Sequence, residues 1–225
     1  MKKLSTTATF IVCALFFVVV GSSCDEKNGE TPPYEYPICE GLPEGPVYVW
    51  PEGLRYYYGG GREIYVNVVP DKITLKLDKK YLSQIQESIQ NNDQILQMEP
   101  LWDYTDVFVL TTAEGADVMA LIGEMRKLPW AKSVNPAYHT VSGENEMYIL
   151  NNQVVVKFRE DVSQHEIGEL LKKYCAKVIK TSSRGSTLLS LPVELDPLEV
   201  SNAIHESGLV HYSEPNIISK ITYEH

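Results

Sequence analysis

Asp71-Lys-Ile-Thr-Leu-Lys-Leu77 and Asn152-Gln-Val-Val-Val-Lys-Phe158 are two versions of one apolar stretch, and each of them opens a longer unit. Ser133-Val-Asn-Pro136 closes the first unit and Tyr212-Ser-Glu-Pro215 closes the second. Between these ends the apolar runs follow the same order: strand, helix, two strands, helix, short strand. A repeat of this length indicates one supersecondary unit per copy, so we expect two copies of one small fold.

The second copy carries the clearer local signals. Ser163-Gln-His-Glu166 is a capping box that should open one helix, and Asp196-Pro197 places an N-cap and a first-turn proline before another. The order predicts an α+β chain of two tandem ferredoxin-like β-α-β-β-α-β sandwiches with antiparallel sheets. The side chains expected in the core of the second copy are Val154, Val156, Leu170, Leu189, Ile204 and Val210.

We divide the chain into five segments: a signal at 1–23, a tether at 24–46, an aromatic hairpin at 47–62, and sandwiches at 63–143 and 144–225. In the hairpin, Val47-Tyr-Val-Trp50 and Leu54-Arg-Tyr-Tyr-Tyr58 flank Pro51-Glu-Gly53, and Gly59-Gly-Gly61 is read as a hinge. Its tyrosines are interpreted as hairpin filling, with a platform for carbohydrate or peptide as the alternative.

The N-terminus has the layout of an export signal. Lys2 and Lys3 precede an apolar run from Phe10 to Val20 that is too short for a stable membrane span. Gly21-Ser-Ser-Cys24 resembles the lipobox of bacterial lipoproteins, with Gly21 where an aliphatic residue is usual, and the following acidic stretch is similar to that of Bacteroidetes surface lipoproteins. The resemblance implies a lipid such as palmitate on Cys24 and an outer-membrane or cell-surface location, with ordinary secretion as the alternative.

Composition and motifs argue against several classes of function. A net charge of −10 is the wrong sign for nucleic-acid phosphates. We find no nucleophile elbow, phosphate loop or dinucleotide fingerprint, and the histidines have no metal-ligand spacing, so we expect no catalytic site, cofactor or metal. A disulfide between Cys39 and Cys175 stays open.

The second copy also resembles a known family. Val154-Val-Val-Lys-Phe-Arg, Ala176-Lys-Val-Ile, Ser190-Leu-Pro and Leu209-Val-His-Tyr-Ser-Glu-Pro-Asn216 look like the N-terminal propeptide of subtilisin-like serine proteases, the fervidolysin type above all. The resemblance covers about residues 148–223 well and 63–141 weakly. The Asp-Thr-Gly, His-Gly-Thr and Gly-Thr-Ser-Met-Ala blocks of the protease itself do not occur in the sequence.

The resemblance implies that the sheet packs on two helices of a protease, while an extended tail, here Ile217 to Tyr223, enters its cleft. Thr222 or Tyr223 would lie beside the nucleophile. The residues expected to contact the protease are Tyr212, Glu214, Pro215, Ile217, Ser219, Ile221, Thr222 and Tyr223. The first copy is interpreted as a packed spacer.

Three functions remain open at this point. The chain is a surface-tethered protein that inhibits a subtilisin-like protease or assists its folding, a structural or binding module for peptide or glycan that has lost protease binding, or the orphaned pro-region of a split protease. The sequence says nothing of the oligomeric state.

Overall fold

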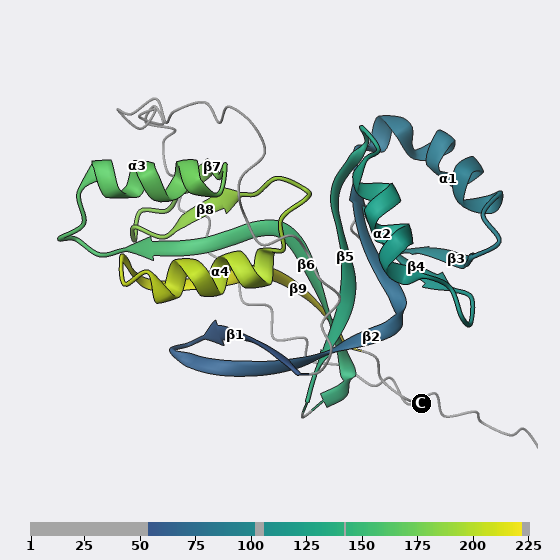
Figure 1. Ribbon diagram of the computed structural model, residues 1–225, viewed down its shortest axis with the longest axis horizontal. Helices are drawn as coiled ribbons and strands as arrows, with labels where there is room; N and C mark the ends of the chain where they lie inside the picture. The colour runs from purple at the N-terminus through teal and green to yellow at the C-terminus, as the bar shows by residue number, and fades with distance from the viewer. Residues whose placement is uncertain (1–53, 102–105, 142, 222–225) are drawn as a thin grey trace, which may run out of the picture. The chain divides into compact units, whose positions relative to one another are not determined.

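The computed structural model describes residues 54–101, 106–141 and 143–221, and the order of elements in it repeats. After a short strand, β1 (Arg55–Gly59), each unit has the order β-α-β-β-α-β (Figure 1). The first unit consists of β2 (Arg62–Leu77), α1 (Leu82–Gln90), β3 (Ile95–Pro100), β4 (Val107–Thr112), α2 (Val118–Arg126) and β5 (Ala131–Thr140), with a 3-10 turn, η1 (Lys79–Tyr81), before α1. The second unit consists of β6 (Gly143–Phe158), α3 (Gln164–Lys173), β7 (Lys177–Thr181), β8 (Thr187–Ser190), α4 (Pro197–Glu206) and β9 (Val210–Ile221).

Strand order confirms the ferredoxin-like prediction for both units. The first sheet runs β3-β4-β2-β5, and the second runs β7-β8-β6-β9, with every pair antiparallel. These two orders are the same topology. Pairing of β5 with β6, at Tyr138 and Tyr148, joins the two sheets into one continuous sheet in the described residues.

Equivalent residues of the two sequence copies are paired in the same way. Ile73 pairs with Pro136 in the first unit, and Val154 pairs with Pro215 in the second. The register also shifts immediately before both pairs, at Val69/Ile73 and at Leu150/Val154. The opening and closing motifs of each copy are therefore hydrogen-bonded partners.

Each unit has its own apolar core between its helices and one face of its sheet. In the second unit, α3 contributes Ile167, Leu170 and Leu171, and α4 contributes Val200 and Ile204. All six side chains predicted for this core are buried. Both predicted helix starts are present, since Ser163 and Glu166 form the capping box and the side chain of Asp196 accepts from the N–H of Leu198.

The strands differ from the prediction mainly in length. Strand β2 begins at Arg62 rather than Asp71, and β6 begins at Gly143 rather than Asn152. Both expected starts lie at the bulges where the register shifts. A bulge interrupts the alternation of side chains without ending the strand, which explains the difference.

The glycines predicted as a hinge form the turn of a hairpin instead. Gly60 and Gly61 have φ values of +57° and +76°, and they connect β1 to β2, with Tyr57 paired to Ile64. Positive φ at both turn residues suits the twist of a two-residue hairpin, and glycine adopts it without strain. The other predicted arm, Val47 to Trp50, lies outside the described residues, as do the signal, the tether and Cys24.

Candidate functional site

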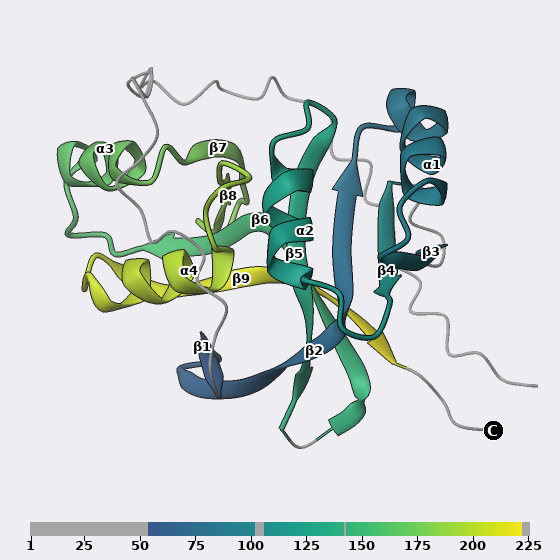
Figure 2. The ribbon, with the colours of Figure 1, turned by 45° about the vertical axis from the view of Figure 1, so that its right-hand side comes forward.

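Six of the eight residues predicted to contact a protease lie on β9, which pairs with β6 along its length (Figure 2). Tyr212 pairs with Lys157 and Glu214 with Val155 before the bulge, and Ile217 pairs with Leu150 after it. The strand then continues to Ile221, opposite Glu146. Thr222 and Tyr223 lie outside the described residues.

The tail expected to begin at Ile217 is extended, but as far as Ile221 it is paired within the sheet. Residues 217–221 are part of the sheet because β6 starts early enough to pair with them. The first unit has the same feature, since Val66 to Val69 pair with the end of β5. Sequence reasoning missed it because both strands were expected to start at their bulges.

Side chains on the two faces of this extension are packed. Ile217 contacts a cluster that contains Val66, Tyr138, Leu150 and Leu198. Its neighbour Ile218 contacts Leu101, Val107 and Val109 of the first unit. The end of β9 is therefore held by apolar contacts with the first unit as well as by hydrogen bonds with β6.

The second sheet also has a face that points away from its helices. Val154, Val156 and Leu189 face the core, so alternation places their neighbours on the opposite side. We call this surface the outer sheet face and define it by Val155, Lys157, Leu188, Tyr212 and Glu214. Cross-strand pairing brings these five together, because Val155 pairs with both Leu188 and Glu214, and Lys157 with Tyr212.

Polar contacts hold two side chains of the outer sheet face. The hydroxyl of Tyr212 lies 2.6 Å from the Oγ of Ser186. Glu214 accepts a hydrogen bond of 3.0 Å from the N–H of Gly60, at the tip of the β1–β2 hairpin. The β1–β2 hairpin thus reaches the second unit.

Arg55 anchors this hairpin against α4, which lies beside it (Figure 1). The guanidinium donates to the Tyr138 hydroxyl at 2.7 Å, to Asp196 at 2.8 Å and to Glu199 at 2.6 Å. Burial opposes its charge, but Tyr138, Asp196 and Glu199 outweigh that effect and raise the pKa of Arg55. Arg55 is far from Asp196 and Glu199 in the sequence, and no local pattern predicts such a contact, so sequence reasoning missed it.

The tyrosines of the hairpin occur on both of its faces. Tyr57 packs into the cluster beneath the hairpin, as the filling interpretation expected. On the other face, Tyr58 stacks on His205 with 3.9 Å between ring centroids, and Tyr56 and Tyr58 both donate to Glu206. Loss of hydration and the nearby Glu206 raise the pKa of Tyr56 to about 12. His205 of α4 is therefore part of the contact between the hairpin and the helix.

The described residues include neither a candidate metal cluster nor a candidate membrane-spanning helix. No group of three or more His, Cys, Asp or Glu side chains among them could hold a metal ion. None of the helices in this part is long and apolar enough to cross a membrane. Cys175 is disulfide-bonded, and Cys39, whose pairing with it the sequence leaves open, lies outside the described residues.

Comparison with known families bears on the second unit. Residues 134–216 match the Fervidolysin N-terminal prodomain. This region is prodomain-like. It begins in β5, contains the whole outer sheet face, and ends at the bulge before Ile217, so the end of β9 lies beyond it. A prodomain is typically non-catalytic, and its usual partner is a protease.

Other comparisons add no functional information. None of the curated proteins matches the chain. Among solved structures, the small subunit of acetolactate synthase from Thermotoga maritima is 12% identical and has a TM-score of 0.27. The likeness covers 69% of this chain and 98% of that one. We draw nothing from a likeness at this level.

Proposed function

We propose that the protein is an exported, lipid-tethered and non-catalytic binder of a subtilisin-like serine protease, which it inhibits or helps to fold. The observation that carries this proposal is the prodomain-like region, which spans every element of the second unit from β6 to the bulge of β9. The prodomain-like region is thus a complete sandwich rather than a fragment of one.

The outer sheet face is the surface through which we expect the protease to bind. Val155 and Leu188 form a half-buried apolar centre, and Lys157, Tyr212 and Glu214 surround it with polar groups. An apolar centre with a polar rim is the usual composition of a protein interface. The helices α3 and α4 pack on the opposite face, so among the elements of the second unit that the structure describes none covers this one.

The end of β9 gives a second contact. Among the described residues β9 pairs only with β6, so its other edge can accept hydrogen bonds from an added strand. Proteases bind extended segments in this way, with main-chain bonds for affinity and side-chain pockets for specificity. Residues 217–221 would therefore act as an ordered edge, and Thr222 and Tyr223 would continue it toward the nucleophile.

An inhibition assay tests the proposal. The purified chain at micromolar concentration should inhibit at least one member of a panel of subtilisin-like proteases, or raise the yield when a denatured member is refolded. Leu188→Glu places a charge in the centre of the outer sheet face and should weaken the effect by at least about tenfold. The matched control is Leu96→Glu, an exposed leucine on the first unit, which should leave the effect unchanged.

Two results would contradict the proposal, the first its function and the second its binding surface. The first is a chain that neither inhibits nor assists any protease of the panel. The second is equal potency of the two variants, which would move the contact away from the outer sheet face. Thermal melting of both variants shows whether a loss of potency reflects unfolding.

The tether is tested separately at Cys24. Cells fed labelled palmitate should yield labelled protein that partitions with membranes, and Cys24→Ala should remove both the label and the partitioning. Membrane association that survives this change would exclude lipidation at Cys24, while leaving the protease proposal intact.

A further inference from the structure

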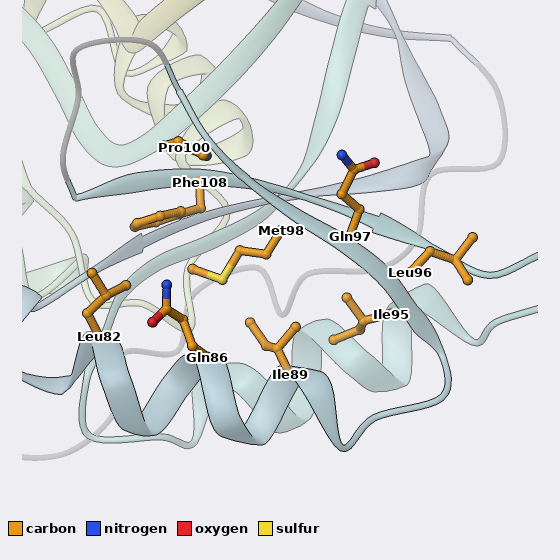
Figure 3. Close-up of a pocket in the computed structure, with 9 residues that line it drawn as sticks. All are labelled: Leu82, Gln86, Ile89, Ile95, Leu96, Gln97, Met98, Pro100 and Phe108. Carbon is orange, nitrogen blue, oxygen red and sulfur yellow. The ribbon is translucent and has the colours of Figure 1, made fainter.

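A groove opens in the first unit between α1 and the edge of the sheet (Figure 3). Its volume is about 660 Å³. Leu82, Gln86 and Ile89 point up from α1 toward it, and Met98 lies across it from β3 (Figure 3). The groove belongs to neither the prodomain-like region nor the outer sheet face. The remaining lining residues are Ile95, Leu96, Gln97, Pro100 and Phe108.

We propose that this groove binds an extended peptide segment of a partner protein, which adds to β3 as a further strand. The inference does not rest on the proposed protease binding. Strand β3 is at the end of the strand order and pairs only with β4 in the described residues. Every second residue of an edge strand points its N–H and C=O away from the sheet, and an added strand satisfies these groups.

The second unit supplies an internal comparison, because its edge strand β7 is built differently. Both strands have a bulge at the same place: Leu96 is the extra residue in β3 and Ile179 in β7, and both are exposed, at 68% and 47%. After the bulge, however, β7 continues with Lys180 where β3 continues with Gln97. An edge lysine is a common device against strand addition, and only β7 has one at this position.

The size of the surface favours a peptide over a second copy of the chain. Strand β3 has six residues, which corresponds to about 20 Å at ~3.3 Å per residue. The gap between the sheet and the helix layer is about 10 Å high. The open side of the unit along β3 therefore has an area of roughly 200 Å². A stable protein interface needs about 800 Å² on each partner. A strand of a few residues fits this surface, whereas a stable dimer needs more.

The exposed carboxylate of Glu99 indicates that the peptide also carries a basic residue. Glu99 lies on β3 and is exposed, and in the described part of the chain it accepts one hydrogen bond, from Gln97, and has no cationic partner. A lysine or arginine in the peptide would pair with it, and the net charge of −10 attracts such peptides in general. We therefore expect alternating apolar residues with a basic residue near Glu99.

The test uses random heptapeptides displayed on phage and selected on the purified chain. Enriched sequences should show the alternating pattern, and each is then synthesised and its affinity measured by titration calorimetry. Gln97→Lys copies Lys180 of the second unit and should weaken binding by at least about tenfold, because the lysine meets the basic peptide at the edge. The matched control, Gln164→Lys at an exposed glutamine of α3, adds the same charge away from both edge strands and should leave the affinity unchanged. Both positions are exposed, so neither change should unfold the chain.

A second measurement distinguishes strand addition from simple apolar binding. N-methylation of alternate peptide residues removes main-chain donors, and one of the two alternating sets should abolish binding while the other does not. The inference is overturned if no peptide is enriched, if binding survives both sets, or if Gln97→Lys binds as well as the parent. It is also overturned if sedimentation shows a dimer that Gln97→Lys dissociates, since a second copy would then occupy β3.

Discussion

At the scale of single residues, Arg55 ties the β1–β2 hairpin to the second unit through a buried ion pair. It is 7% exposed, and its partner Asp196 is 1% exposed. Asp196 also caps α4, so one buried carboxylate serves the helix and the hairpin together. A buried ion pair need not stabilise a protein more than an apolar pair would, but removing one partner leaves an uncompensated charge.

Replacing Arg55 should therefore be costly. We expect Arg55→Met to lower the free energy of unfolding by about 3–5 kcal/mol, because Asp196 stays buried without its cation. Urea unfolding followed by circular dichroism measures the change. Arg62→Met, at an exposed arginine of the same hairpin, is the control and should change stability by no more than about 0.5 kcal/mol.

The pH dependence of this effect follows from the raised pKa of Arg55. A group whose folded pKa is raised contributes stability below its unfolded pKa and loses it only as the pH rises through the folded value. For an arginine that loss lies beyond the working range, so the cost of Arg55→Met should be the same from neutral to moderately alkaline pH. A cost that disappears in this interval, or equal effects of the two variants, would contradict the ion-pair account.

At the scale of elements, the sequence predicts the helix starts and the core of the second unit but not the ends of the long strands. The helix starts could be read because Ser163, Glu166 and Asp196 form bonds within a few residues of themselves. The core of the second unit could be read because alternation and helical periodicity are also local. The early starts of β2 and β6 could not be predicted, since the bulges beside Asp71 and Asn152 depend on pairing with other strands. The contacts of Arg55 and the end of β9 have no local signal either.

Hydrogen exchange should confirm that the end of β9 is a strand. Amides of residues 217–220 that bond to β6 should exchange slowly, whereas a free tail would exchange at the rate of an unfolded chain. Ile218→Asp puts a charge against Leu101, Val107 and Val109 and should reduce the protection by at least about tenfold, or about 1.4 kcal/mol of opening free energy. Ser219→Asp, at the exposed neighbour, should change it little.

This experiment also bears on the route by which the chain would engage a protease. Fast exchange of residues 217–220 in the parent chain would show that this segment is not stably paired with β6 and can enter a protease cleft as a free tail. Slow exchange, together with inhibition that survives Ile218→Asp, would leave the outer sheet face as the sufficient contact.

At the scale of the whole molecule, the two copies share too much structure to be independent. Asn135 of the first closing motif donates to Asn152 of the second opening motif at 3.0 Å. Leu150 and Leu198 of the second unit pack with Val66 and Tyr138 of the first. Together with the pairing of β5 with β6, these contacts cross between the predicted sandwiches at 63–143 and 144–225. Small domains bury little core alone, and such contacts add to what each buries.

We therefore expect the two units to unfold in a single transition. Leu189→Ala removes a fully buried side chain from the core of the second unit and should cost about 2–5 kcal/mol. Its effect can be followed in the first unit through Trp130, a buried core residue, in a chain that carries Trp50→Phe and Trp102→Phe. The urea midpoint of Trp130 fluorescence should fall together with that of circular dichroism, and Leu96→Ala, at an exposed side chain, should move neither. If Leu189→Ala instead splits the transition and leaves Trp130 at its original midpoint, the contacts at Asn135, Tyr138 and Arg55 do not couple the units, and the second sandwich folds by itself.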